Sequence, residues 1–199
     1  MPEVMDLTGL GVMEPVFSPS GQRLYFSSET SSMKGKPNDI YYIERTESGW
    51  SDPESMPDPV NSAYKEYNLS ETHSGRVYFT REGVGILRSH VTETGYSEPE
   101  AIASLAGYTY ASHPFVAPDE SYLIFDSTKA GGQGSADLYI AFIENGLVGQ
   151  PINLGTTINS GDWDAMPQVS PDGRVLFFVR ENSQGRDIYW VKFDVEAYR

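Results

Sequence analysis

The chain repeats one phrase four times, and this repetition constrains its fold more than any other feature. The clearest copy, P-Q-V-S-P-D-G-R-V-L-F-F, begins at Pro167, and the others begin at Pro15, Leu69 and Pro114. Subtraction of these numbers gives intervals of 54, 45 and 53 residues. A period near fifty is typical of the blades of a β-propeller. Each copy contains strand-length runs separated by turn signals and has no helical periodicity, so the sequence predicts an all-β chain.

Each copy also carries a nearly unbroken apolar run after a tight turn. These runs are Leu24–Phe26, Val77–Phe79, Tyr122–Phe125 and Val175–Phe178. A strand with one wet face alternates apolar and polar residues, whereas an unbroken run indicates a sheet covered on both faces, as in a ring of blades. Glu120 stands where the other turns have glycine, so we expect that turn to differ in type or to be mildly strained.

The ends of the copies predict how the ring closes. The first three copies end in an outer-strand segment that begins at Pro53, Pro99 or Pro151, and the fourth copy lacks one. Pro2–Met5 resembles this segment, so residues 2–8 are expected to complete the last blade and remove an exposed edge. The alternative is an open or oligomer-completed array. We therefore predict one propeller domain, residues 1–199, with blades at about 12–56, 65–105, 110–156 and 163–199 plus 2–8.

Charge and composition exclude several classes of protein. The formal net charge is −14, which disfavours nucleic acid and anionic membrane surfaces as partners. Cysteine is absent, so no disulfide framework or thiolate chemistry is available. The first ten residues have neither the basic nor the apolar region of a signal peptide. No apolar run approaches the roughly 18 residues that a membrane-spanning helix needs, so no membrane insertion is expected.

The repeated phrase resembles that of a known family. P-x-x-S-P-D-G-x-x-L-x-F is followed by D-I-Y or D-L-Y and then by G-W-S-x-P and I-N-S, which resembles the TolB-type, WD-like β-propeller repeat of bacteria. The resemblance covers essentially the whole chain, although the second copy has Leu69 in place of the proline and Gly85 in place of the aspartate. It implies a protein-binding module of the bacterial envelope, periplasmic or secreted, and the family also supplies scaffolds for some hydrolases and lyases.

Positions at which the copies differ are the candidates for a site. The residues that precede the first strand's proline position are Glu14, Asn68, His113 and Met166. First strands line the axis of a propeller, so these side chains are expected to converge at one mouth of its channel. Asp162 and Asp164 lie just upstream of the fourth copy. Together these groups could hydrogen-bond a small polar ligand or coordinate a metal. The alternative is a narrow, plugged channel.

A second variable ring follows the second strands. Its members are Ser28, Arg81, Ser127 and Arg180. Arg81 and Arg180 come from opposite blades, and a pair of guanidinium groups at one mouth would bind a carboxylate or sulfate. Alternatively, each arginine pairs with a neighbouring acid, which the sequence suggests is Glu82, Glu181 or Glu14. By contrast, the recurrent Asp39, Asp137 and Asp187 are interpreted as structural, because nearly every copy has one.

The sequence favours binding over catalysis. It contains no nucleophile elbow, phosphate loop, H-E-x-x-H motif or cofactor signature, and no metal site is predicted. We predict that a protein or small polar ligand binds at the mouth lined by Glu14, Asn68, Arg81, His113, Asp164 and Arg180. The alternative is a hydrolase or lyase acting on a carbohydrate or an acidic small molecule, with Glu14 and His113 as its acid–base pair.

Overall fold

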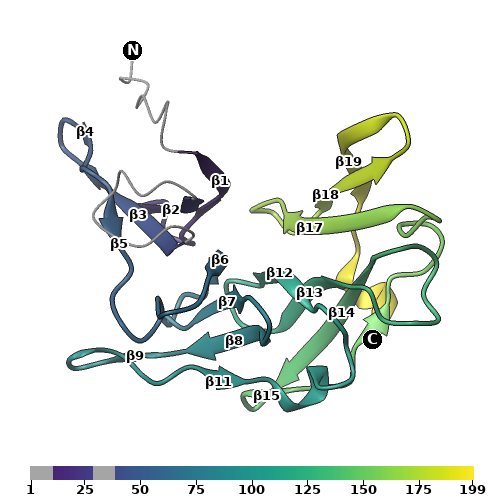
Figure 1. Ribbon diagram of the computed structural model, residues 1–199, viewed down its shortest axis with the longest axis horizontal. Coiled ribbons are helices and arrows are strands. Elements are labelled where there is room, and N and C mark those ends of the chain that lie inside the picture. The colour runs from purple at the N-terminus through teal and green to yellow at the C-terminus, as the bar shows by residue number, and fades with distance from the viewer. Residues whose placement is uncertain (1–10, 29–38) are drawn as a thin grey trace.

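Four antiparallel sheets stand around a common axis (Figure 1). The computed structural model describes residues 11–28 and 39–199. The innermost strands are β1 (Val12–Phe17), β6 (Glu66–Glu71), β12 (Ser112–Val116) and β17 (Trp163–Val169). From each of these the sheet is built outward in sequence order. The chain is thus the all-β, four-bladed β-propeller that the repeats predict.

Blades 1 and 3 have the same plan. Blade 1 continues through β2 (Arg23–Ser28), β3 (Asp39–Thr46), β4 (Gly49–Trp50) and β5 (Glu54–Ser55). Blade 3 continues through β13 (Tyr122–Ser127), β14 (Asp137–Glu144), β15 (Leu147–Val148) and β16 (Ile152–Asn153). In both blades the third strand pairs with a short outer strand, β5 or β16, that follows the predicted proline.

Blades 2 and 4 differ in their outer parts. Blade 2 comprises β6, β7 (Val77–Arg81), β8 (Gly85–Ser89) and β11 (Glu100–Ala101), with a small hairpin of β9 (Val91–Thr92) and β10 (Gly95–Tyr96). A 3-10 helix, η1 (Ala103–Leu105), leads to blade 3. Blade 4 has β17, β18 (Val175–Asn182) and β19 (Gly185–Lys192), followed by η2 (Val195–Tyr198). Residues 2–8, which were predicted to complete this blade, lie outside the described residues.

The structure reveals that the repeating unit is a pair of blades. Asn61 bridges the backbone of Ile40 in β3, and Asn159 bridges Leu138 in β14 in the same way. The two asparagines are 98 positions apart by subtraction. Each lies in the connection from an odd blade to the next even one, and ties that connection to the third strand of the odd blade. The connection between blades 2 and 3 contains η1 instead.

Apolar side chains fill three of the seams between neighbouring blades. Buried clusters lie between blades 1 and 2, blades 2 and 3, and blades 3 and 4. Sheets in these seams are covered on both faces, as the unbroken apolar runs predict. Within residues 11–28 and 39–199 the seam between blades 4 and 1 is open: Phe177, Ile188 and Trp190 are 39%, 75% and 64% exposed, and Phe17 of β1 is 57% exposed. In Figure 1, β1 and β17–β19 form the two ends of the arc.

The unusual turn of blade 3 has the expected strain and a compensating contact. Glu120 has a φ of 61°, the left-handed conformation that glycine adopts in the equivalent turns. Its carboxylate accepts hydrogen bonds from Arg76 Nη1 at 2.6 Å and from the hydroxyl of Tyr78 at 2.7 Å, both in blade 2. The side chain that strains the turn therefore joins two blades. Among the described residues no helix is long and apolar enough to cross a membrane.

Candidate functional site

Every inner strand has a β-bulge at the same position. The register of each inner strand against its partner shifts around one residue, and that residue has positive φ. The four are Glu14 (55°), Asn68 (49°), His113 (50°) and Met166 (56°). Residues other than glycine adopt this conformation at a cost of about 1–3 kcal/mol each, and such strain is concentrated at functional sites. A bulge redirects its side chain, so the four residues that the repeats single out share one strained geometry.

A hydrogen bond from each bulge backbone joins it to the preceding blade, except at the open seam. The backbone N–H groups of Asn68, His113 and Met166 donate to Ser27 Oγ, Thr80 Oγ1 and Asp126 Oδ1 at 3.1, 3.0 and 3.1 Å. These three acceptors occupy equivalent positions on the second strands. We call these bonds axial latches. In blade 4 the equivalent residue is Val179, which has no acceptor to offer β1.

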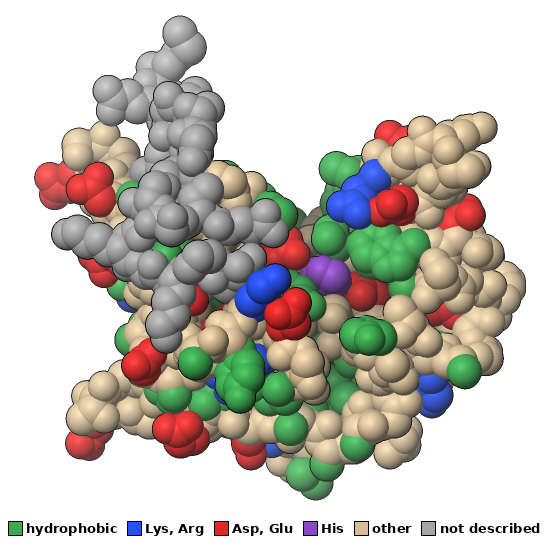
Figure 2. Space-filling model, viewed as in Figure 1, with side chains coloured by type: hydrophobic (Ala, Val, Ile, Leu, Met, Phe, Trp, Pro, Cys, Tyr) green, Lys and Arg blue, Asp and Glu red, His purple; other side chains and the backbone are tan. Residues whose placement is uncertain are grey.

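His113 is the centre of the site and receives contacts from all four blades. Its Nδ1 donates to Asp126 Oδ1 at 2.8 Å, and its Nε2 lies 3.4 Å from Glu14 Oε1. The ring centroids of Tyr67 and Trp163 are 5.5 and 6.4 Å away. Figure 2 shows a histidine at the centre of this face, beside acidic side chains. Blades 1, 2 and 4 therefore meet the imidazole of blade 3.

Two carboxylates keep this buried imidazole charged. Burial opposes the charge, but the charge and hydrogen bond of Asp126 and those of Glu14 outweigh it and raise the pKa of His113 to about 10. Side chains of Glu14, Asp126 and His113 are only 10%, 5% and 11% exposed. Two carboxylates against one imidazolium give the trio a formal net charge of −1.

A polar cavity opens beside this trio. It has a volume of about 280 Å³, and we call it the axial cavity. Its lining includes Glu14, Ser27, Lys65, Tyr67, Glu82 and His113. Ser27 Oγ donates to Glu14 Oε2 at 2.9 Å, and Lys65 Nζ lies 3.5 Å from Glu82 Oε1 at the exposed side. The lining thus offers both donors and acceptors to a space of the size of a small metabolite.

Arg81 and Arg180 are held inside their own blades. Arg81 Nε donates to Glu66 Oε1 at 2.5 Å, and Arg180 Nε donates to Asp164 Oδ1 at 2.6 Å. Both carboxylates are fully buried, and each arginine also donates to backbone carbonyls of the preceding connection. The predicted alternative, pairing with an acid, describes them well, although neither partner is one that the sequence suggested.

Asp164 therefore belongs to a clamp within blade 4. Its Oδ2 accepts from the backbone N–H and hydroxyl of Ser160 at 2.6 and 2.8 Å, while Oδ1 binds Arg180. Glu66 repeats this arrangement with Ser62 in blade 2. The serines and acids of the two clamps are 98 positions apart by subtraction, like the two asparagines, and the arginines are 99 apart. We assign Arg81, Asp164 and Arg180 a structural role in the even blades.

Two residues of the site, Asp126 and Tyr67, were not predicted from the sequence. Asp126 is a buried acid within the apolar run of β13, in the position taken by Ser27, Thr80 and Val179 in the other blades. In an alignment of the four copies, Asp126 would therefore stand out as a charged residue at a position that is neutral in the other three. Of the recurrent aspartates, Asp137 has the expected structural role, because it accepts hydrogen bonds from the backbone N–H groups of residues 133 and 134.

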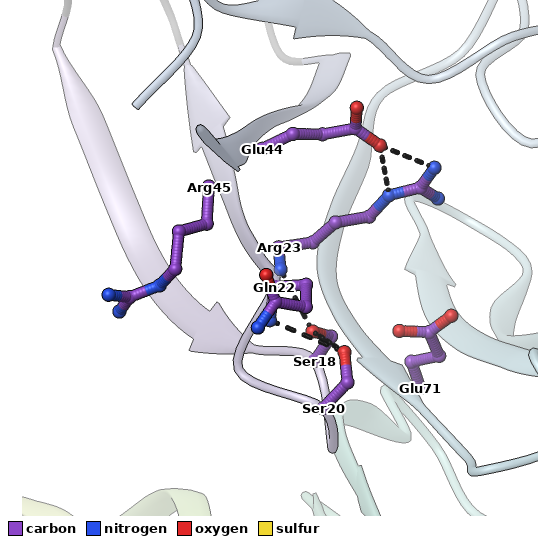
Figure 3. Close-up of a pocket in the computed structure, with 7 residues that line it drawn as sticks. All are labelled: Ser18, Ser20, Gln22, Arg23, Glu44, Arg45 and Glu71. Atoms are coloured by element: carbon purple, nitrogen blue, oxygen red, sulfur yellow. Dashed lines mark hydrogen bonds and ion pairs between the residues drawn. The ribbon is translucent and has the colours of Figure 1, made fainter. Parts of the chain in front are cut away.

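A second polar cavity lies at the far end of β1 (Figure 3). Its volume is about 400 Å³, and its lining includes Ser18, Arg23, Glu44, Arg45 and Glu71. Arg23 is already bound to Glu44 by two contacts of 2.6 and 2.7 Å, and Arg45 lies over the ring of Trp50. Arg23 and Glu44 are therefore paired with each other within blade 1. Nowhere in the described chain do three or more His, Asp or Glu side chains form a group that could hold a metal ion.

Comparison with known proteins identifies the fold. No protein-family model and no curated protein matches the chain. TolB from Acinetobacter baumannii superposes with a TM-score of 0.56 at 18% identity, over 92% of this chain and 41% of that one. A putative TolB from Agrobacterium tumefaciens gives 0.54 at 16% identity, over 94% and 78%. The chain has the β-propeller fold that these two structures share.

The same fold also occurs in an enzyme. The exo-1,5-alpha-L-arabinanase from a bovine ruminal metagenomic library superposes on this chain with a TM-score of 0.62. Identity is 16%, and the match covers 98% of this chain and 81% of the arabinanase. At such identities the likeness extends to the fold and not to the activity. The chain spans 41% of the length of the Acinetobacter TolB.

Proposed function

We propose that this propeller is a binding module that takes a small polar ligand in the axial cavity. The observation that carries the proposal is the contact of His113 with all four blades beside that cavity. An ion pair of this kind, nine-tenths buried and built on strained backbone, costs stability that an apolar plug would not. The cost is offset where the same groups bind something. By its family resemblance, we place this role in the bacterial envelope.

The chemistry of the cavity favours a ligand rich in hydroxyl or amino groups. Glu14 and Glu82 offer carboxylate oxygens, His113 and Lys65 offer charged donors, and Tyr67 offers an aromatic face. A monosaccharide or polyol satisfies such a mixed lining, because each hydroxyl both donates and accepts. Arg81, Asp164 and Arg180 support the ligand through the blades that they brace. Asn68 does not line this cavity, but its backbone N–H donates to Ser27 Oγ, which does.

Screening for thermal stabilisation tests the proposal. We expect at least one sugar, polyol or organic acid to raise the melting temperature of the wild type, because a ligand that binds only the folded state stabilises it. The rise should vanish in Glu14→Gln and in His113→Asn. Asparagine is the replacement for His113 because it tolerates positive φ. Glu44→Gln, which alters the exposed ion pair with Arg23, is the matched control and should respond as the wild type does. An equal rise in all four proteins would refute the axial cavity as the site.

Glycoside hydrolysis is the second candidate function. The arabinanase likeness and the 3.4 Å approach of His113 to Glu14 favour it, because two titratable groups lie within reach of each other. However, a histidine whose pKa is raised to about 10 is a poor proton acceptor at neutral pH. In a hydrolysis assay with 1,5-linked arabinan we therefore expect the wild type to be no faster than Glu14→Gln. A measurable difference in rate would favour the enzyme.

A further inference from the structure

The open seam contains a cavity of its own. We call it the seam cavity; its volume is about 290 Å³, and it lies between β1 on one side and β18 and β19 on the other. The walls are apolar: Pro15 and Val16 face Phe177 and Ile188. These side chains belong to the blade faces that the other three seams bury against a neighbour. An apolar molecule would restore the missing contact.

The inner end of the seam cavity is polar and incomplete. Asn68 is 3% exposed, and its Oδ1 has no hydrogen-bond partner. A buried carbonyl oxygen without a donor costs about 1–3 kcal/mol. Asn68 and Glu14 both line the cavity, so it has an amide and a carboxylate beside its apolar walls. Both are acceptors, so the missing group is a donor.

Charge decides which kind of donor fits. Glu14, Asp126 and His113 together carry a net charge of −1, and Lys65 is already paired with Glu82. A carboxylate on the ligand would be repelled from this position, and a ligand hydroxyl would leave the negative charge uncompensated. An ammonium group supplies three donors and the complementary charge.

We propose that the seam cavity binds a small primary amine, with its ammonium group between Asn68 and Glu14 and its apolar body between the faces of blades 4 and 1. Val16 and Phe177 hold the body from either side, and Ile188 covers it at the solvent. This site shares Glu14 with the axial cavity but differs from it in ligand class and in its walls. It rests on the proposed function only to the extent that Glu14 is available for binding.

Phenethylamine is the probe, with 2-phenylethanol and 3-phenylpropionate as matched compounds without its charge. Trp190 pairs with Phe177 across β18 and β19, so its fluorescence reports on this wall. We expect saturable quenching by the amine, at least tenfold weaker binding of the alcohol and no binding of the acid. Equal affinity for the amine and the acid would overturn the proposal.

Variants on the wall and at the head test the position. Ile188→Lys should weaken the amine at least tenfold, because it places a like charge and a polar chain in the slot. Leu147→Lys on β15 is the control: Leu147 and Ile188 are 73% and 75% exposed, so both changes leave the core intact. Asn68→Gly keeps the positive φ and removes the unpartnered oxygen, and should also weaken binding tenfold. Unchanged affinity in both Ile188→Lys and Asn68→Gly would refute the site.

The same measurements separate the two proposals. His113→Asn removes a wall of the axial cavity and leaves the apolar walls of the seam cavity, so it should abolish the polar ligand and retain most amine affinity. Ile188→Lys should do the reverse. If amine binding fails while the polar ligand still depends on His113, the seam proposal falls alone. If the polar ligand fails while the amine depends on Ile188, only the proposed function falls.

Discussion

His113 makes stability depend on pH in a direction that can be stated in advance. Its pKa in the folded protein is about 10, whereas an unfolded histidine titrates near about 6.5. The folded state therefore holds a proton that the unfolded state has lost between these values. The contribution is complete below about pH 6.5 and is lost as the pH rises through about 10.

The first prediction follows from this proton. Between pH 7 and 9.5 the free energy of unfolding should fall by about 1.4 kcal/mol per pH unit more steeply in the wild type than in His113→Asn. Urea unfolding at intervals of half a pH unit measures both slopes. Groups that do not contact His113 titrate alike in the two proteins and cancel in the difference. Parallel curves would show that the imidazole is neutral in the folded state.

At the residue level, the repeat predicted the positions of the site better than its chemistry. Alignment of the copies singled out Glu14, Asn68, His113 and Met166, and all four occupy the same bulge. The bulge itself has no sequence signal, because none of the four is glycine. Asp126 was missed because its contact with His113 depends on strand register, which sets partners that are 13 residues apart in the chain.

Among the elements, the inner strands depend on the axial latches. His113 N–H donates to Thr80 Oγ1, and both residues are at least nine-tenths buried. Loss of a buried acceptor leaves the N–H without a partner, which costs more than the net value of the bond. At the equivalent place in blade 4, Val179 leaves the open seam without a latch.

Exchange of these two side chains tests the role of the latch. Thr80→Val should destabilise the protein by about 1–3 kcal/mol, since the shape is kept and the acceptor is lost. The reverse change, Val179→Thr, should alter stability by less than about 0.5 kcal/mol, because its hydroxyl meets no N–H of blade 1 at its present distance. Midpoints of urea unfolding measure both. A gain of more than 1 kcal/mol in Val179→Thr would mean that the open seam closes in solution.

The clamps show why sequence alone did not define the roles of the two arginines. Spacing placed Arg81 and Arg180 on opposite blades, which suggested one shared anion site. Their partners, Glu66 and Asp164, lie two residues before the bulge, where the register between the first and second strands brings acid and base face to face. The pairing of each arginine with its acid could be recognised only once the register of the two strands was known.

For the whole molecule, the sequence predicted the number and order of the blades but not the unequal seams. Period, turn chemistry and unbroken apolar runs are local signals, and they describe every blade. Whether two faces meet across a ring depends on the sum of all the blade angles, which no local signal carries. Exposed Phe177 and Ile188 are therefore visible only in the structure.

Unequal seams should give unequal protection. β6–β8 and β12–β14 pack on both faces, whereas β17–β19 have one face against blade 3 and one at the open seam. We expect backbone amides of β18 to exchange with deuterium at least tenfold faster than those of β13, because local opening of blade 4 loses fewer apolar contacts. Hydrogen exchange with mass spectrometry measures this ratio. Equal rates in the two strands would contradict an open seam.

The four bulges give a protein engineer an unusual choice. A sequence selected for stability alone would have glycine at positions 14, 68, 113 and 166, because glycine adopts positive φ without penalty. This chain instead has an acid, an amide, an imidazole and a thioether, at a combined cost on the order of several kcal/mol. The axis is therefore the place where consensus-style stabilisation and ligand binding oppose each other. Glycine at these positions would relieve the backbone strain and leave an empty centre, ready to accept a site of different chemistry.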